Sequence, residues 1–263
     1  MKLVYGSVAL AIGVALAVGA VAQTPSPAPS TDSLIARHAT ARGGLPALRA
    51  IHTLTMTGTM RQDGFDAPFG FRELLARPGE ARIELTLQGL TIVQAYDGNA
   101  GWQIQPFQGR KDAEDLSTDD AKSLAEEADF EDALIDAKAK GSTVESLGAI
   151  DVDGAPAWAL RVSLKNGDQL TYYLDPDAML TVRLVTRQVV RGAEVFTQTD
   201  YGDYEQVAGV WLPFELASGP RGSSQKQRVT YAKVVANDPV DGAIFARPAS
   251  PAPTPPPAHP ESH

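Results

Sequence analysis

Apolar and polar residues alternate with a period of two along much of the chain. The alternation starts at Leu54, where threonines separate the apolar positions, and it returns after Phe69 and again around Leu85. A strand with one apolar and one polar face is typical of an antiparallel sheet that is half buried. The middle of the chain is therefore predicted to be mainly β.

Turn signals divide this pattern at hairpin spacing. Asp97-Gly98, Asp153-Gly154 and Asn166-Gly167 each stand between two apolar runs, and the segments 180–190 and 195–204 form two long predicted strands. The pattern predicts about nine to eleven strands in one meandering sheet. A sheet of that many strands is expected to curl, because large open sheets twist strongly.

Apolar residues at helical spacing replace the period of two at the start of the domain and in the centre of the chain. A helix is predicted over 32–42, where Asp32 or Thr31 can cap its first turn. A central helical segment is predicted over 117–139, with a second short helix from Phe130 to Ala139, and the charged stretch from Arg110 is assigned to the same segment. These helices are expected to point their acidic side chains to solvent and their leucines and alanines inward.

The two ends of the chain have the composition of processing and linker segments. Residues 1–22 have the charged, apolar and small-residue order of a cleavable secretory signal, which predicts export to the periplasm or secretion. Residues 23–31 are predicted to be a spacer and 246–263 a disordered proline-rich tail. This leaves a single domain at 32–245. Beyond the signal, no apolar stretch reaches the roughly 18 residues of a membrane-spanning helix.

Charge and cysteine usage narrow the possible partners. Without Lys2 of the signal, 22 of the 23 basic residues remain against 32 acidic ones, which argues against nucleic acid and anionic lipid surfaces as partners. The chain has no cysteine, so it has neither a disulfide framework nor a thiolate nucleophile.

Catalytic and metal-binding patterns are not found. Outside the tail the histidines are His38 and His52, without carboxylates at metal-ligand spacing, and both are interpreted as ordinary surface residues. The aspartates near Asp153 and Asp175 lie in turns, where aspartate is favoured for local hydrogen bonding. The prediction is a protein that is not an enzyme and has no cofactor, no metal and no catalytic residue.

Several longer stretches resemble a known family. They are GGLPALRAIHTLTMTG (43–58), GLTIVQAYDGNAGWQIQPFQG (89–109), EEADFEDALIDAKAKGSTVESLG (126–148), LKNGDQLTYYLDPDAML (164–180) and DYEQVAGVWLPFEL (203–216). In this order they resemble the bacterial outer-membrane lipoprotein-sorting proteins with the LolA/LolB-like fold. The chain differs from the family's receptor in lacking a lipid-anchored cysteine, and it is longer than the family's carrier.

The resemblance implies a curved antiparallel half-barrel whose apolar hollow is covered by an N-terminal helix and a central helical lid. It also implies a carrier that shields the acyl chains of a lipid or lipoprotein, received from and passed to other envelope proteins. The apolar residues expected to line the hollow are Leu54, Met56, Met60, Phe69, Phe71, Ile83, Leu85, Leu87, Ile92, Trp102 and Ile104 on the strands, with Leu124, Phe130 and Leu134 on the lid.

Two other interpretations remain open. The same fold can serve as an interaction or sensor module, in which the acidic segment 112–136 or the tail binds another envelope protein. A hydrolase is the third possibility, and it is based on His38 and His52 alone.

Overall fold

The structure, a computed structural model, describes residues 28–249. The predicted signal and the end of the proline-rich tail lie outside the described residues. The strands are β1 (Thr53–Gln62), β2 (Phe69–Ala76), β3 (Glu80–Leu87), β4 (Leu90–Tyr96), β5 (Gly101–Gln105), β6 (Arg110–Asp115), β7 (Thr143–Val152), β8 (Ala155–Ser163), β9 (Gln169–Leu174), β10 (Thr181–Val190), β11 (Ala193–Val207), β12 (Val210–Pro220) and β13 (Gln227–Ala236).

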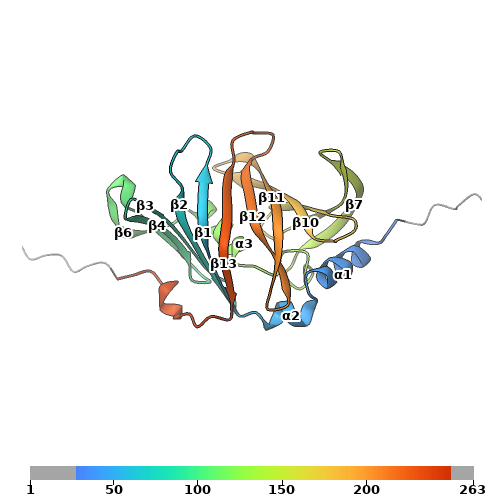
Figure 1. Ribbon diagram of the computed structural model, residues 1–263, viewed down its shortest axis with the longest axis horizontal. Coiled ribbons are helices and arrows are strands. Elements are labelled where there is room, and N and C mark those ends of the chain that lie inside the picture. The colour runs from blue at the N-terminus through green and yellow to red at the C-terminus, as the bar shows by residue number, and fades with distance from the viewer. Residues whose placement is uncertain (1–27, 250–263) are drawn as a thin grey trace, which may run out of the picture.

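All thirteen strands form one antiparallel sheet in the order β6-β5-β4-β3-β2-β1-β13-β12-β11-β10-β9-β8-β7. β1 and β13 lie side by side in the middle, although they come from opposite ends of the domain, and β6 and β7 are the two ends of the sheet (Figure 1). The sheet curves without closing. The prediction of a mainly β, unclosed antiparallel fold is confirmed, with two strands more than the upper expected number.

Helices are few and short. They are α1 (Thr31–Ala41), α2 (Leu45–Ala50) and α3 (Thr118–Glu127), with single 3₁₀ turns η1 (Pro106–Gln108) and η2 (Gly242–Ile244). Ser30 caps α1, and Ser117 caps α3 by accepting a hydrogen bond from the backbone N–H of Asp120 at 3.1 Å. Within residues 28–249, none of the helices has the length and apolarity needed to cross a bilayer.

Two local predictions in the acidic region are wrong. Arg110–Asp115 is not helical but forms the edge strand β6, which pairs with β5 and leaves its charged side chains in solvent. Residues 130–139 form successive turns in place of a helix. Asp132 and Asp136 have φ values of +74° and +54°, which a right-handed helix excludes. The guanidinium of Arg42 also binds the carbonyl oxygens of Phe130 and Glu131, which in a helix would accept backbone hydrogen bonds.

The segment 128–142, called the inner loop here, follows α3 and shares the concave side of the sheet with it. α3 packs against β3, β4 and β5, where Leu124 joins a core with Leu54 and Leu75. At the other end of the sheet, Leu34 of α1 and Leu134 of the inner loop pack against β8 and β9. The concave face is thus covered at both ends and less completely between them.

A glycine in β1 lies at a β-bulge between the two central strands of the sheet. The register between β1 and β13 shifts between Thr57 and Gly58, so β13 carries one extra residue there. A Cβ atom added to Gly58 would lie 2.0 Å from the carbonyl oxygen of Thr230. That distance is far below a van der Waals contact, so only glycine permits this close approach of the two strands.

We therefore expect Gly58→Ala to destabilise the fold by about 2–4 kcal/mol, since the backbone of β13 must move. Gly70→Ala in β2 is the matched control, because its added Cβ would lie 3.7 Å from Thr86 in ordinary contact. The control is expected to be neutral or slightly stabilising. Urea unfolding of both variants measures the difference, and equal stabilities would show that the close approach does not constrain the sheet.

Candidate functional site

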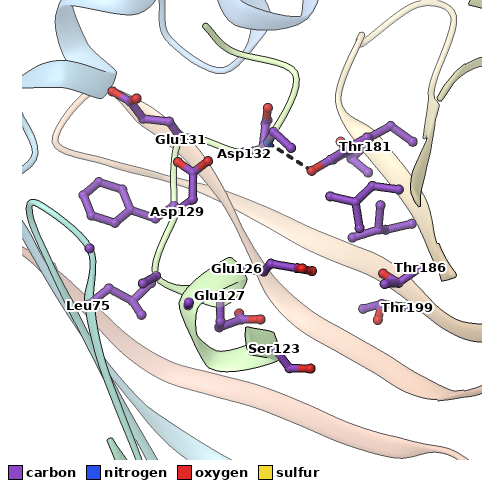
Figure 2. Close-up of a pocket in the computed structure, with 18 of the residues that line it drawn as sticks. Leu75, Ser123, Glu126, Glu127, Asp129, Glu131, Asp132, Thr181, Thr186 and Thr199 are labelled. Carbon is purple, nitrogen blue, oxygen red and sulfur yellow. Dashed lines mark hydrogen bonds between the residues drawn. The ribbon is translucent and has the colours of Figure 1, made fainter. Parts of the chain in front are cut away.

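A cavity of about 990 Å³ lies on the concave side of the sheet, between α3 and the inner loop on one side and strands β9 to β12 on the other. Figure 2 shows the carboxylates of Glu126, Glu127 and Asp129 in this space, with Leu75 on one side and Thr186 and Thr199 on the other. The volume is at the upper end of the range for pockets that bind small molecules.

One part of the wall is apolar. Leu54 and Met56 of β1 and Leu75 of β2 meet Leu212 and Leu216 of β12 across the middle of the sheet. Each of these strands points alternate residues to the concave side, so the apolar residues of neighbouring strands form one continuous surface. This surface can hold a hydrocarbon chain without leaving a polar group unpaired.

The part of the wall on β10, β11 and β12 carries hydroxyl groups. Thr186 lies directly opposite Thr197 in the sheet, and Thr199 lies opposite Ser218. The last pair shares a hydrogen bond of 3.0 Å between the two hydroxyl oxygens. The amide of Gln188 extends this row toward the turn between β10 and β11. The cavity therefore has a polar end and an apolar middle.

A cluster of buried charges holds the inner loop against α1. Nη1 of Arg42 donates to Oδ2 of Asp132 and to the carbonyl oxygen of Glu131, both at 2.7 Å, and Nη2 donates to the carbonyl of Phe130 at 3.1 Å. The ring nitrogens of His38 contact Oδ2 of Asp132 at 2.9 Å and the carbonyl oxygen of Met179 at 2.7 Å. Both partners of the ring are hydrogen-bond acceptors, so the imidazole is held between a carboxylate and a backbone carbonyl.

These contacts set the charge of Asp132. Burial alone would raise the pKa of its carboxyl, but the hydrogen bond from His38 and the charge of Arg42 together hold the pKa below its usual value. Asp132 is therefore ionised and paired. His38 is only 1% exposed, so its interpretation as a surface residue is wrong; the negative charge that makes its burial possible comes from Asp132, which is remote in sequence.

A second arginine supports the same loop from β2. Nη2 of Arg77, the residue after β2, donates to Oε1 of Glu131 at 2.6 Å, and its Nε donates to the carbonyl oxygen of Ile51 at 2.8 Å. The guanidinium carbon of Arg77 also lies 4.8 Å from the ring centroid of Phe130. The inner loop is thus fixed by two arginines from distant parts of the chain.

A pair of carboxyl groups lies where α3 approaches β2. Glu73 of β2 is buried and accepts a hydrogen bond of 2.6 Å from the hydroxyl of Tyr231. Burial and the neighbouring charge of Glu127 raise the pKa of Glu73 to about 8, and burial also raises the pKa of Glu127. At neutral pH this pair therefore holds a proton, because two ionised carboxylates in contact would repel each other.

Two more acidic groups, one at the end of α3 and one in the inner loop, are held near the cavity by polar partners. Burial raises the pKa of Glu126 to about 7, and its carboxylate accepts a hydrogen bond of 2.8 Å from Asn166. Burial also raises the pKa of Asp129, although Nζ of Lys140 lies 2.6 Å from its Oδ2. The expectation that the acidic side chains point to solvent is therefore wrong for Glu126, Asp129, Glu131 and Asp132, because an asparagine, a lysine and two arginines bind them.

The residues predicted to line the hollow are found in five places, four on the concave side of the sheet and one on the convex side. Leu54, Met56 and Phe130 line the cavity. Phe71, Ile83 and Leu124 pack in the core beneath α3, and Leu134 packs with β8 and β9. The strand pairing places Met60, Phe69, Leu85, Leu87 and Ile92 on the same face as Met56, outside the cavity.

Trp102 and Ile104 lie on the convex face of the sheet. There they pack with Val93 and Ala95, and Nε1 of Trp102 donates to the carbonyl oxygen of Phe245 at 2.7 Å. The chain after β13 crosses this face, so apolar residues are buried on both sides of β4 and β5. Neither residue lines the cavity, although their alternation suits either face.

The polar wall was not predicted. Thr186, Thr197, Thr199 and Ser218 alternate along their strands like the polar positions of a solvent-facing side. Only the pairing of β10 with β11 and of β11 with β12 shows that they face the hollow. Across residues 28–249, no group of three or more acidic or histidine side chains is arranged to hold a metal ion.

Comparisons with known proteins identify the fold. Neither protein-family models nor curated proteins match the sequence. A LolA superfamily protein from Nitrosomonas europaea has a similar structure with a TM-score of 0.56 and 11% identity, over 83% of this chain and 98% of that one. A domain described as an outer membrane lipoprotein-sorting protein from Vibrio parahaemolyticus gives a TM-score of 0.55 and 10% identity, over 82% and 95%. The chain therefore has the LolA-like fold, as the sequence resemblance predicted.

The raised pKa of Glu73 makes stability depend on pH. The folded state keeps the proton of this carboxyl up to about pH 8, whereas the unfolded chain releases it near its ordinary pKa of 4.5. Its contribution is thus complete below about pH 4.5 and is lost as the pH rises through 8. We expect the free energy of unfolding of Glu73→Gln to fall less between pH 5 and 8 than that of the unchanged protein. At pH 8 the variant should be more stable than the unchanged protein by on the order of 2–4 kcal/mol.

The control is Glu145→Gln, which removes an exposed carboxylate on β7. Its free energy of unfolding should follow the pH dependence of the unchanged protein. Chemical unfolding at a series of pH values gives the three curves. Parallel curves for Glu73→Gln and the unchanged protein would mean that Glu73 is ionised at neutral pH.

Proposed function

We propose that this protein is an exported carrier that binds the acyl chain of a lipid or lipoprotein in the cavity between the sheet and the inner loop. The observation that supports this most strongly is the cavity of about 990 Å³ with its apolar surface formed by β1, β2 and β12. An ordinary core of this size would be filled by its own side chains, because protein interiors are close-packed.

The gain from enclosing such a ligand is large. Each methylene group removed from water contributes about 0.8 kcal/mol, so an acyl chain of about sixteen carbons gains on the order of 12 kcal/mol. A carrier must therefore cover the chain in water and release it only to a better acceptor. The two covered ends of the concave face and the open middle suit this role.

The mixed wall favours an amphipathic ligand over a plain hydrocarbon. The acyl chain would lie against Leu75, Leu212 and Leu216, and the polar group of the ligand would lie at the hydroxyl row that includes Thr186 and Thr199. A polar group that enters a cavity loses its hydration and needs hydrogen-bond partners there. The hydroxyls and the protonated carboxyl groups can supply both donors and acceptors.

The place of action that we propose is the bacterial periplasm, reached through the signal segment 1–22, with other envelope proteins as donor and acceptor. The LolA-like fold supports this proposal. The alternative is a module that binds another envelope protein through the acidic segment 112–136, and the structure gives it less support. Glu131 and Asp132 of that segment are paired with arginines inside the fold and are not free to attract a basic partner.

The proposal predicts that a bulky side chain in the cavity blocks uptake. Thr199 is half buried and faces the cavity, so Thr199→Trp should fill part of the space that the ligand needs. We expect the affinity for a fluorescent fatty acid to fall at least about tenfold, which corresponds to about 1.4 kcal/mol. Fluorescence titration of the chain from Gln23 onward measures this affinity.

Thr230→Trp is the matched control, since it places the same side chain on the exposed convex face of β13. This variant should bind the fatty acid like the unchanged protein. Circular dichroism of both variants tests whether the sheet is intact. No uptake by the unchanged protein, or equal uptake by both variants, would contradict the proposal.

A further inference from the structure

Six hairpin ends lie along one rim of the half-barrel. In an antiparallel sheet successive turns alternate between the two rims formed by the ends of the strands. Gln62 at the end of β1 is paired with Gln227 at the start of β13. The turn that follows β1 and the turn that precedes β13 therefore lie at the same rim, and Figure 1 shows the β1–β2 and β12–β13 turns side by side there. The hairpin rim is defined here as residues 61–68, 87–90, 105–112, 164–168, 189–196 and 220–228.

Exposed apolar side chains gather on this rim. Among the described residues, seven large apolar side chains are exposed, and Trp211 is the one that lies at the opposite edge. The others are Phe65, Leu90, Phe107, Val189, Val195 and Phe196. Phe65 is 57% exposed and Val189 is 47% exposed. A single exposed apolar residue is ordinary, but six of seven on one rim indicate a surface that meets something apolar.

The rim also has the opposite charge to the rest of the molecule. Apart from Lys226, whose Nζ is buried, and the buried Asp168, it carries seven lysines and arginines and four acidic residues, whereas the whole chain has 23 and 32. Arg61 and Arg228 are exposed and directly opposite each other on β1 and β13. Like charges in this position repel, and neither arginine forms an ion pair with a residue in the described part of the chain. An anionic surface would relieve this repulsion.

The cavity reaches the same rim. Lys165 and Asn166, in the turn between β8 and β9, belong to the hairpin rim and also line the cavity. The hydroxyl row that includes Thr186 and Ser218 also lies toward this edge of β10 and β12. A molecule that leaves the cavity past these residues therefore comes out among the basic and apolar side chains.

We propose that the hairpin rim docks on an anionic lipid membrane. The exposed phenylalanines, leucine and valines would enter the boundary between head groups and acyl chains, and the arginines and lysines would bind the anionic head groups. The six apolar residues come from four separate hairpin ends. Side chains spaced in this way can enter a fluid bilayer one by one, whereas a protein partner requires a contiguous, shape-complementary patch.

This inference refines the sequence-based exclusion of anionic lipid surfaces, which considered only the total charge. Electrostatic attraction to a membrane falls off within about 10 Å, so the charge of the nearest surface decides it. The docking does not rest on the proposed function, because the rim could bind a membrane with the cavity empty. The two proposals therefore fail in separate experiments.

The test is co-sedimentation of the chain from Gln23 onward with vesicles of phosphatidylcholine, with and without phosphatidylglycerol. We expect binding to the anionic vesicles that weakens as salt is added. Each rim arginine contributes about 1 kcal/mol at such a surface, so Arg61→Gln/Arg228→Gln should bind about 20–30-fold more weakly at low salt. Phe65→Ser/Phe107→Ser should also bind more weakly, with the salt dependence unchanged.

The control is Lys138→Gln/Lys233→Gln, which removes the same charge from exposed positions away from the rim. It should bind like the unchanged protein, and circular dichroism should show all variants folded. Absence of binding to anionic vesicles would overturn the inference, as would an equal loss in the rim and control variants. Vesicle binding without fatty-acid uptake would support the rim and contradict only the carrier.

Discussion

The concave face of a sheet that curls without closing must be covered, and this requirement determines much of the structure. Thirteen strands create more concave surface than one short helix can fill. α3 covers the β3–β5 end, and α1 with the inner loop covers the β8–β10 end. The cavity is the space that remains between these two covers. Its position therefore follows from where the covers are attached.

Buried ion pairs make that attachment. Arg42 and Arg77 bind the inner loop through Asp132 and Glu131, and Arg42 also donates to the carbonyl oxygens of Phe130 and Glu131. Replacing such a pair by apolar residues can leave stability unchanged or increase it, so stability alone does not explain the pairs. They fix an irregular segment in one conformation and leave the space beside it open. A loop held only by apolar contacts could collapse into the hollow.

The sequence predicted the fold more fully than the site. Period-two alternation identified the faces of β1 and β2, and Leu54 and Met56 do line the cavity. The pattern could not show which part of the concave face a helix would fill, so Ile83 was expected in the cavity but packs in the core beneath α3. The pattern does not show that Trp102 faces the convex side, because a strand with apolar residues on both faces does not reveal its orientation. Threonines such as Thr199 have the alternation of solvent-facing positions, and only the strand pairing shows that they face the hollow.

The central claim is that the cavity holds an amphipathic lipid, and the contents of the protein itself test this most directly. The chain from Gln23 onward should be purified without detergent after export, extracted with organic solvent, and the extract examined by mass spectrometry. We expect lipids or lipid-modified peptides in a near one-to-one ratio with the protein. They should be depleted when the side chain at Thr199 is enlarged. An extract free of acyl chains, from a protein with an intact sheet, would contradict the claim.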